Sequence, residues 1–379
     1  MSTPRPPAPR SPGWVIGRVA GAPVVVAPSW LVAVAVLTFL SAGTVRILTG
    51  LEGSAVYVVS LAFVVLLFVS VFLHELAHGL VAKARGQQPQ EFVLTLWGGH
   101  TAFGGEAPTA ATTALVAVVG PIVNLVLAGV FWAVLRSGAV DRGTVLFALM
   151  WSGAVTNGFV GVFNLIPGLP LDGGRVLAAL VWGVTKDQVK GTLVAGWVGR
   201  VVAVGVFVVA VGYPMALGGR IDLVSLLWAA MIAAFLWSGA GAAVQGSRLR
   251  RALDQVTLAS MGRPAVGVAH DTSVAQAGAY AASVGAQEVV LLSPDGRPAA
   301  YVDRHAAAAV PADVAGTTPL TAVSVPLPGG AVVDGSLAGA ELVRAVSQAT
   351  QHTPVVVAMV GGRVVGLVRA ADVVAAIRG

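Results

Sequence analysis

Six long apolar stretches constrain the fold of this chain more than any other feature. An α-helix needs about 20 apolar residues to cross the hydrocarbon core of a bilayer. Six stretches are close to that length or exceed it: Trp30–Leu48, Ala55–Val81, Ala110–Leu135, Thr144–Phe163, Leu193–Leu217 and Ile221–Val244. The sequence therefore predicts a multi-span α-helical membrane protein with about six transmembrane helices.

Composition agrees with this architecture and divides the chain. Only 11% of the residues are charged and the mean hydropathy is +0.84, whereas a soluble domain has roughly 25% charged residues. A single large soluble core is therefore excluded. Most of the charge lies near the N-terminus, in short loops and beyond Arg248. We expect a cytoplasmic, partly disordered N-terminal segment (1–28), a transmembrane domain (29–247) and a soluble α/β domain in the cytoplasm (248–379).

Basic residues are distributed unequally between alternate loops. With the N-terminus inside, most loop Lys and Arg residues fall on the cytoplasmic side, and few fall on the other. The positive-inside rule then predicts a multi-pass protein of the cell membrane with both termini in the cytoplasm. The net charge of +6 comes from scattered Arg rather than basic blocks, so no nucleic-acid partner is expected. The chain has no Cys, which excludes a thiolate metal site.

The second apolar stretch ends in the motif His74-Glu75-x-x-His78. On a helix this spacing puts two imidazoles one turn apart on one face, as two metal ligands require, and the Glu between them can act on a metal-bound water. Ionisable groups at membrane depth are costly and mark functional sites. The alternative interpretation is that both His side chains make only helix–helix contacts.

A catalytic zinc ion usually has three protein ligands and one open position. Asp172 is the best candidate for the third ligand, because Pro167 and Pro170 precede it and cannot continue a regular helix. We interpret this segment as the broken cytoplasmic end of span four, with Asp172 at the depth of His78. In most sequences an aspartate in this position, taken alone, would be a helix cap or a turn residue.

Together the two motifs resemble the site-2 protease family of intramembrane zinc metalloproteases, peptidase family M50. That family has a His-Glu-x-x-His helix and a distant Asn-x-x-Pro-x-x-x-x-Asp-Gly motif, which is matched here by Asn164, Pro167, Asp172 and Gly173. The resemblance covers residues 14–244. It implies that His74, His78 and Asp172 hold one Zn²⁺ ion and that Glu75 is the general base.

A further family element resembles Gly120-Pro121-Ile-Val-Asn124 in span three. The resemblance implies that Asn124 lies near the active site, and we expect it to be a catalytic donor that stabilises an oxyanion or positions substrate. A helix–helix hydrogen bond is the alternative. His100, in the loop sequence Gly98-Gly99-His100, is a further candidate ligand, although a solvated loop histidine explains it as well.

The implied function is an intramembrane zinc endopeptidase that cuts a peptide bond in or near a transmembrane segment, as in regulated intramembrane proteolysis. The expected partners are the lipid bilayer and a single-span membrane protein, such as an anti-sigma factor or a similar regulator. We interpret Phe92–Phe103 as two short strands around Gly98-Gly99 that clamp an unwound peptide by strand addition. Spans five and six could gate lateral access.

Two other functions remain open. The chain could be a CBS-regulated ion or metal transporter whose transport site is the His/Glu/Asp cluster. It could also be a catalytically inactive scaffold, although the complete set of His, Glu and Asp residues argues against this. A transporter that used Glu75 as a ligand would lose metal in Glu75→Gln, whereas a protease would keep it.

The C-terminal region contains a duplicated pattern. Glu288–Ser293, a turn and Ala299–Val302 correspond to Pro354–Val360, a turn and Val364–Val368, followed by a helix predicted over Ala370–Arg378. The two units resemble a tandem pair of CBS domains, which implies an adenine-nucleotide sensor. Arg369 stands where that family usually has Ser or Thr. Nucleotide binding and a purely structural or homodimer-forming role therefore both remain open.

Overall fold

A computed structural model describes residues 11–96, 98–104, 107–219, 221–329 and 331–372. The chain divides into two compact units, Met1–Ser247 and Arg248–Gly379. Each unit has its own architecture.

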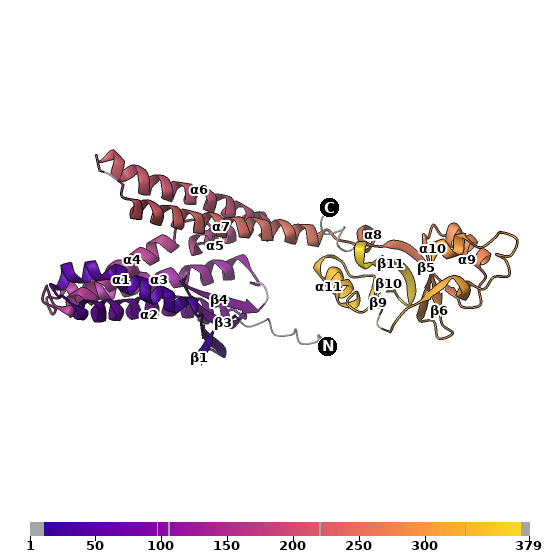
Figure 1. Ribbon diagram of the computed structural model, residues 1–379, viewed down its shortest axis with the longest axis horizontal. Coiled ribbons are helices and arrows are strands. Elements are labelled where there is room, and N and C mark those ends of the chain that lie inside the picture. The colour runs from indigo at the N-terminus through magenta and orange to yellow at the C-terminus, as the bar shows by residue number, and fades with distance from the viewer. Residues whose placement is uncertain (1–10, 97, 105–106, 220, 330, 373–379) are drawn as a thin grey trace. The chain divides into compact units, whose positions relative to one another are not determined.

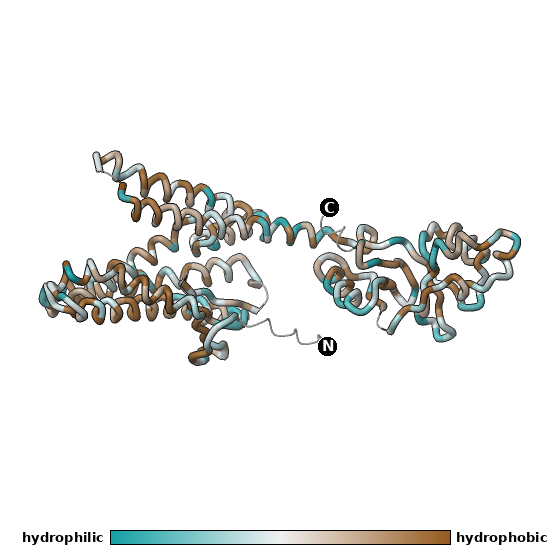
Figure 2. Tube along the Cα trace, viewed as in Figure 1, coloured by the Kyte–Doolittle hydropathy of each residue, from teal (hydrophilic) through white to brown (hydrophobic). Residues whose placement is uncertain are grey.

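The first unit contains six helices that are long and apolar enough to cross a membrane, which confirms the predicted spans (Figure 1). They are α1 (Ser29–Thr49), α2 (Ser54–Ala84), α3 (Ala110–Arg136), α4 (Val145–Asn164), α6 (Gln188–Ala216) and α7 (Leu223–Asp254). Figure 2 shows that these helices consist largely of hydrophobic residues. Many of their large apolar side chains are exposed, whereas the buried positions include polar residues such as Ser60, Ser70 and Asn157. A membrane protein needs this pattern, because the surface that faces the lipid must be apolar and polar groups must find partners inside the protein.

The segment that carries Asp172 differs from the prediction. Helix α4 ends at Asn164, residues 165–171 form turns, and Asp172 is the first residue of a separate helix, α5 (Asp172–Thr185). Asp172 therefore begins a new helix rather than extending the broken end of span four. Glycine allows this loop to approach α6 closely, because a Cβ atom on Gly168 would lie 2.8 Å from Gly199 Cα.

A four-stranded sheet lies beside the helices, in the order β1-β2-β3-β4. Its strands are β1 (Trp14–Val19), β2 (Ala22–Val26), β3 (Gln88–Thr95) and β4 (Gly98–Gly104). The predicted hairpin is therefore present, but its turn comes earlier than expected. Gly98 and Gly99 pair with Thr95 and Leu94 inside the ladder instead of forming the turn.

The β1–β2 hairpin was not predicted. The described part of the segment expected to be partly disordered, from Ser11 on, is mostly ordered, and the predicted disorder before it lies outside the described residues. Positive φ angles at Ala20 (56°) and Gly21 (93°) form the hairpin turn. The hairpin joins the sheet because β2 pairs in parallel with β3, which lies more than 60 residues later in the chain.

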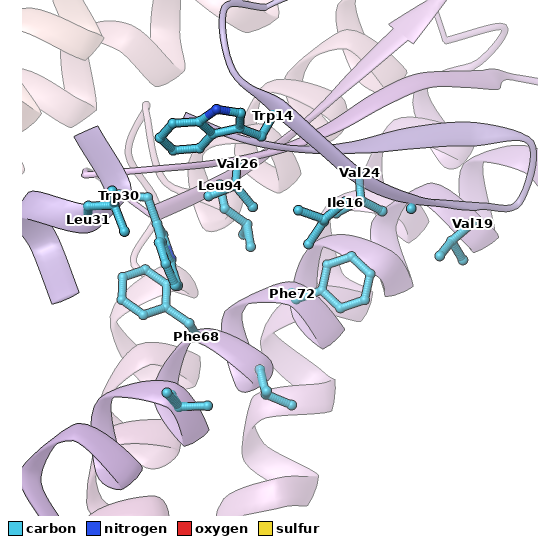
Figure 3. Close-up of a pocket in the computed structure, with 13 residues that line it drawn as sticks. Trp14, Ile16, Val19, Val24, Val26, Trp30, Leu31, Phe68, Phe72 and Leu94 are labelled. Carbon is cyan, nitrogen blue, oxygen red and sulfur yellow. The ribbon is translucent and has the colours of Figure 1, made fainter. Parts of the chain in front are cut away.

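The hairpin and the outer faces of α1 and α2 enclose an apolar cavity of about 670 Å³ (Figure 3). Trp30 packs edge-to-face on Phe68 in its wall, with ring centroids 5.2 Å apart. Phe72, also in the wall, lies roughly half a turn around α2 from His74. The cavity therefore lies on a different face of α2 from the histidine pair.

The second unit contains a seven-stranded sheet in the order β8-β7-β6-β5-β11-β10-β9. The first repeat consists of β5 (Arg263–Ala269), α9 (Val274–Ser283), β6 (Glu288–Leu292), β7 (Pro298–Val302) and α10 (Arg304–Ala308). The second consists of β9 (Val332–Asp334), α11 (Gly339–Ala349), β10 (Val355–Val360) and β11 (Arg363–Arg369). The remaining short elements are α8 (Leu258–Met261), a 3₁₀ turn (Leu320–Val323) and β8 (Ser324–Pro326).

This unit thus has the duplicated arrangement predicted for a tandem CBS pair. Its core is conventional, since Leu342 and Val346 of α11 pack on Val356 and Val368 with almost no exposure. Of the predicted last helix, residues 370–372 are helical and the rest lies outside the described residues.

Candidate metal centre

Three predicted ligand atoms meet in the interior of the first unit. Asp172 Oδ2 lies 3.0 Å from His74 Nε2 and 3.2 Å from His78 Nε2. The two Nε2 atoms are 3.0 Å apart. All three side chains are buried. The structure therefore brings together two residues of α2 and one residue that lies about a hundred positions later.

Hydrogen bonds orient both imidazoles. His74 Nδ1 lies 2.5 Å from Asn124 Oδ1, and His78 Nδ1 lies 2.5 Å from the Val116 carbonyl oxygen. These oxygens can only accept, so each Nδ1 carries the proton of the neutral ring. Both Nε2 lone pairs then point toward the Asp172 carboxylate. Three acceptor atoms in contact repel one another unless a proton or a metal cation lies between them.

The donor set fits a zinc ion. Nitrogen and oxygen ligands about 2.0–2.1 Å from a tetrahedral zinc are roughly 3.3 Å apart, close to the separations of 3.0 to 3.2 Å found here. Nitrogen and carboxylate ligands also agree with a chain that has no Cys. His74, His78 and Asp172 would hold the metal and leave a fourth position open.

Glu75 lies beside these ligands and has a separate partner. Thr101 Oγ1 donates to Glu75 Oε2 over 2.8 Å. Gly99 packs on the same side chain, because a Cβ atom there would lie 2.6 Å from Glu75 Cγ. Strand alternation places Gly99 and Thr101 on the face of β4 toward α2 and His100 on the other face. His100 is exposed and lies outside the cluster.

Glycine at position 120 makes room for the ligands. A Cβ atom on Gly120 of α3 would lie 2.7 Å from His74 Nε2 and closer still to His78 Nε2. Only a residue without a side chain permits this approach. Sequence reasoning placed Gly120 in a motif but missed this role, because the motif does not show which helix lies opposite.

Asn124 is 1% exposed and bonded at both ends of its amide. Its Oδ1 accepts from His74, and its Nδ2 donates to Asn157 Oδ1 over 2.8 Å. Asn157 Nδ2 in turn donates to Ser70 Oγ over 3.2 Å. Asn124 therefore lies behind a ligand, whereas the predicted role as a catalytic donor stays a prediction. Asn157 and Ser70 were missed, although polar residues within apolar stretches were a usable signal.

The C-terminal unit contains a different polar cluster. Glu288 is 1% exposed, and its Oε1 lies 2.9 Å from Arg369 Nη1, 3.4 Å from Arg263 Nη1 and 4.0 Å from Arg304 Nη1. The three arginines also line a cavity of about 620 Å³. Backbone N–H groups at the start of α10 donate to Asp303 at the rim and hold its pKa below the usual range.

Fold and site together define a multi-span membrane protein with a buried cluster of three donor residues that could hold a metal, and with an adjacent glutamate. Residues 62–141 and 137–209 match the sequence model of Peptidase family M50. Residues 62–209 therefore have the sequence pattern of this family, which the two motifs also resemble.

Two curated relatives and one solved structure are similar to this chain. "Putative zinc metalloprotease sll0528" of Synechocystis is 32% identical over 243 residues, which cover 64% of this chain and 62% of the relative. "Putative zinc metalloprotease Rip3" of Mycobacterium tuberculosis is 35% identical over 227 residues, 59% and 57% of the two chains. The chain thus spans less than two thirds of either relative. The site-2 protease from Methanocaldococcus jannaschii superposes with a TM-score of 0.42 at 23% identity, over 61% of this chain and 94% of that one.

Proposed function

We propose that this protein is an intramembrane zinc endopeptidase that hydrolyses a peptide bond in or near a transmembrane segment of a membrane protein. One observation carries the proposal. The lone pairs of His74, His78 and Asp172 converge on one point, and Glu75 lies beside them with a separate hydrogen-bond partner. A peptidase needs this division between ligands and base.

The chemistry of the residues follows from this division. Zinc, when bound, supplies Lewis-acid chemistry that acidifies a water molecule and polarises a carbonyl group. Glu75 Oε accepts the proton of the attacking water and returns it to the leaving amine nitrogen. The Thr101 hydroxyl donates to Oε2 and fixes the orientation of the carboxylate. Asn124 and the Val116 carbonyl hold the two imidazoles in the required tautomer.

The outer edge of β4, where no other strand of the described residues pairs, is a suitable place for an extended substrate. A transmembrane helix bonds all its carbonyl groups internally and must unwind before it is cut. β4 is the last strand of its sheet, and Gly99 and Thr101 of this strand touch Glu75. A peptide that adds to this edge would satisfy its freed backbone groups beside the base.

Lateral access could pass between α4 and the pair α6 and α7. These helices and Leu96, which follows β3, line an apolar cavity of about 790 Å³, to which Phe159, Phe163 and Phe235 contribute rings. Aromatic and aliphatic side chains suit an apolar helix. We infer that α6 and α7 form the gate predicted for spans five and six.

The substrate class and the orientation complete the proposal. The loop charges support cytoplasmic termini in the cell membrane and a cleavage site near the cytoplasmic face. A single-span protein, such as an anti-sigma factor, fits a site of this kind. Comparing membrane proteomes of the native host with wild type and with Glu75→Gln would identify it, because the substrate should accumulate only with the variant.

The decisive experiment measures zinc and cleavage in the same sample. In reconstituted liposomes, Glu75→Gln should retain one zinc per chain and reduce cleavage of a single-span substrate by roughly 10²–10⁴-fold, the usual contribution of a general base. Glu75→Asp is the matched control, since it keeps the charge and shortens the side chain. Loss of zinc in Glu75→Gln, together with zinc flux through wild-type liposomes, would instead favour the transporter.

We further propose that the C-terminal unit acts as a CBS-type regulatory pair that binds an adenine nucleotide or joins two copies of the chain. The cavity beside Arg263, Arg304 and Arg369 supports an anionic ligand. Calorimetric titration of the full-length protein with AMP and ATP, repeated with Arg304→Ala, tests the first role. Light scattering tests the second.

A further inference from the structure

An arginine within a membrane span remains unexplained by the proposed chemistry. Arg200 lies on α6, 12 residues after its first residue, Gln188. Its guanidinium carbon lies 4.6 Å from the ring centroid of Trp197 on the same helix and 5.3 Å from that of Trp237 on α7. Two aromatic faces therefore flank one cation.

No acidic group of the described residues neutralises this cation. α6 contains no Asp or Glu, and α7 contains only Asp254, at its last position. Among the described residues, no hydrogen bond or ion pair reaches Arg200, and its Nε is buried without a partner. A buried donor without an acceptor is costly, and an intramembrane charge usually marks a ligand or a partner.

The surroundings of Arg200 are open to the bilayer. Trp197 and Trp237 are 51% and 48% exposed. Gly241 on α7 adds no side chain, and a Cβ atom there would stand 3.6 Å from Arg200 Nη2. Helical side chains tilt toward the helix N-terminus. The guanidinium accordingly lies over Trp197, one turn closer to the start of α6 and to the adjacent membrane surface.

We propose that Arg200, Trp197 and Trp237 form a binding site for the phosphate group of an anionic phospholipid. The guanidinium donates to phosphate oxygens, and its planar donors suit that geometry. The indoles flank the glycerol region, where tryptophan is favoured in membranes. Basic pockets between transmembrane helices commonly recognise anionic headgroups. A zwitterionic lipid binds less well because its own cation lies close to its phosphate.

The site adjoins the loop that precedes Asp172. Leu169 N donates to the Ala195 carbonyl of α6 over 3.1 Å, and Gly199 contacts the same loop residue. A lipid at Arg200 thus binds the helix that supports this loop. Under the proposed protease function, anionic lipid would therefore increase the cleavage rate. Lipid binding itself does not depend on that function.

Native mass spectrometry of the full-length protein tests the proposal directly. Wild-type protein titrated with dioleoyl-phosphatidylglycerol should bind one lipid molecule tightly. Dioleoyl-phosphatidylcholine should bind with lower affinity. Arg200→Gln should weaken phosphatidylglycerol binding roughly fivefold, the effect of one basic residue near an anionic headgroup. Arg200→Lys should have a smaller effect, because it keeps the charge. Arg46→Gln, in the last turn of α1, is the matched control and should change nothing.

Two further measurements distinguish a lipid site from a soluble-phosphate site and from a contact between helices. Inorganic phosphate at millimolar concentration should not displace the lipid, and displacement would assign the site to a soluble phosphate instead. The melting temperature should rise with phosphatidylglycerol in wild type only. An equal shift in Arg200→Gln, or equal affinity for both lipids, would overturn the proposal and leave Arg200 as a contact between α6 and α7. A normal lipid profile in a protein without cleavage activity would count against the protease alone.

Discussion

The two units each bury a polar cluster, and the clusters differ in one respect. Glu288 is buried against three partly exposed arginines, Arg263, Arg304 and Arg369, so the protein supplies its counter-charges. The cluster of His74, His78 and Asp172 consists only of acceptor atoms once the Nδ1 protons are assigned. The carboxylate of Glu288 thus has cationic partners within the fold, whereas the acceptor atoms of His74, His78 and Asp172 need a proton or a metal cation between them.

This difference distinguishes a charge that is neutralised within the fold from a cluster that can recruit a cation. Buried charges are tolerated when other groups of the fold compensate them. Where the fold instead orients lone pairs toward one another, as at Asp172 Oδ2, a bound ion can supply the opposite charge. The contrast can be tested by removing single groups from either cluster.

The largest effect is expected for Asp172→Asn. The change keeps the shape of the side chain and removes the charge, so zinc binding should weaken by more than the roughly 10–100-fold typical of groups behind the ligands. Cleavage should be lost with it. Metal content by plasma mass spectrometry and competition with a fluorescent chelator measure the change. Unaltered zinc affinity would show that Asp172 is not a ligand.

Gly120→Ala should also displace the ligands. The new methyl group would lie within 2.7 Å of His74 Nε2, and overpacking of this kind costs about 1–3 kcal/mol, or roughly 5- to 150-fold in zinc affinity. Gly129→Ala on the same helix is the control, because nothing lies within 4 Å of the position that its new methyl group would take. Equal zinc affinity in the two variants would contradict the packing role of Gly120.

Substitutions of Asn124 separate its two roles. Asn124→Ala removes the acceptor of His74 Nδ1 and should weaken zinc about tenfold. Asn124→Asp keeps an acceptor there and should retain zinc. If the aspartate variant binds zinc but cleaves as slowly as the alanine variant, Asn124 also donates to the substrate, as the sequence motif predicts. Chelator competition and initial rates distinguish these outcomes.

The smallest effect on the metal centre is expected for Glu288→Gln. Zinc content should not change, whereas the C-terminal unit should lose about 1–3 kcal/mol of stability, less than a fully buried pair would lose. The expected loss is smaller than for a fully buried pair because the arginines are partly exposed. Their exposed fractions are 30% for Arg369, 43% for Arg263 and 56% for Arg304. Hydrogen exchange of peptides from residues 248–372 measures the loss. If hydrogen exchange increased only in the first unit, Glu288 would not stabilise the C-terminal unit as predicted.

Local signals predicted most of the fold. The six spans were predicted within a few residues at most ends, because each is a contiguous apolar run whose length the bilayer dictates. The His74-Glu75-x-x-His78 motif predicted its own geometry, since helical periodicity alone puts i and i+4 on one face. The duplication after Arg251 was also predictable, because each repeat has its own local pattern of strand, turn and strand.

Long-range contacts were not predictable in the same way. The β1–β2 hairpin depends on pairing with β3 across more than 60 residues, and its strands carry only a short apolar pattern. Helix α5 was not predicted, because the prolines before it indicated the end of span four and not the start of a new helix. Asn157 and Thr101 gave no motif, because their roles depend on which helix or strand lies opposite them.

The sequence by itself therefore determined that the chain spans a membrane and carries two histidines, a glutamate and a distant aspartate in a metallopeptidase pattern. Only the tertiary structure decided that these groups meet within 3.2 Å, that carbonyl oxygens fix both imidazole tautomers, and that Gly120 leaves space for them. The reason is physical. Hydropathy and helical period act between neighbours in the chain, whereas the need for a cation arises from lone pairs that α2, α3 and α5 bring together in space.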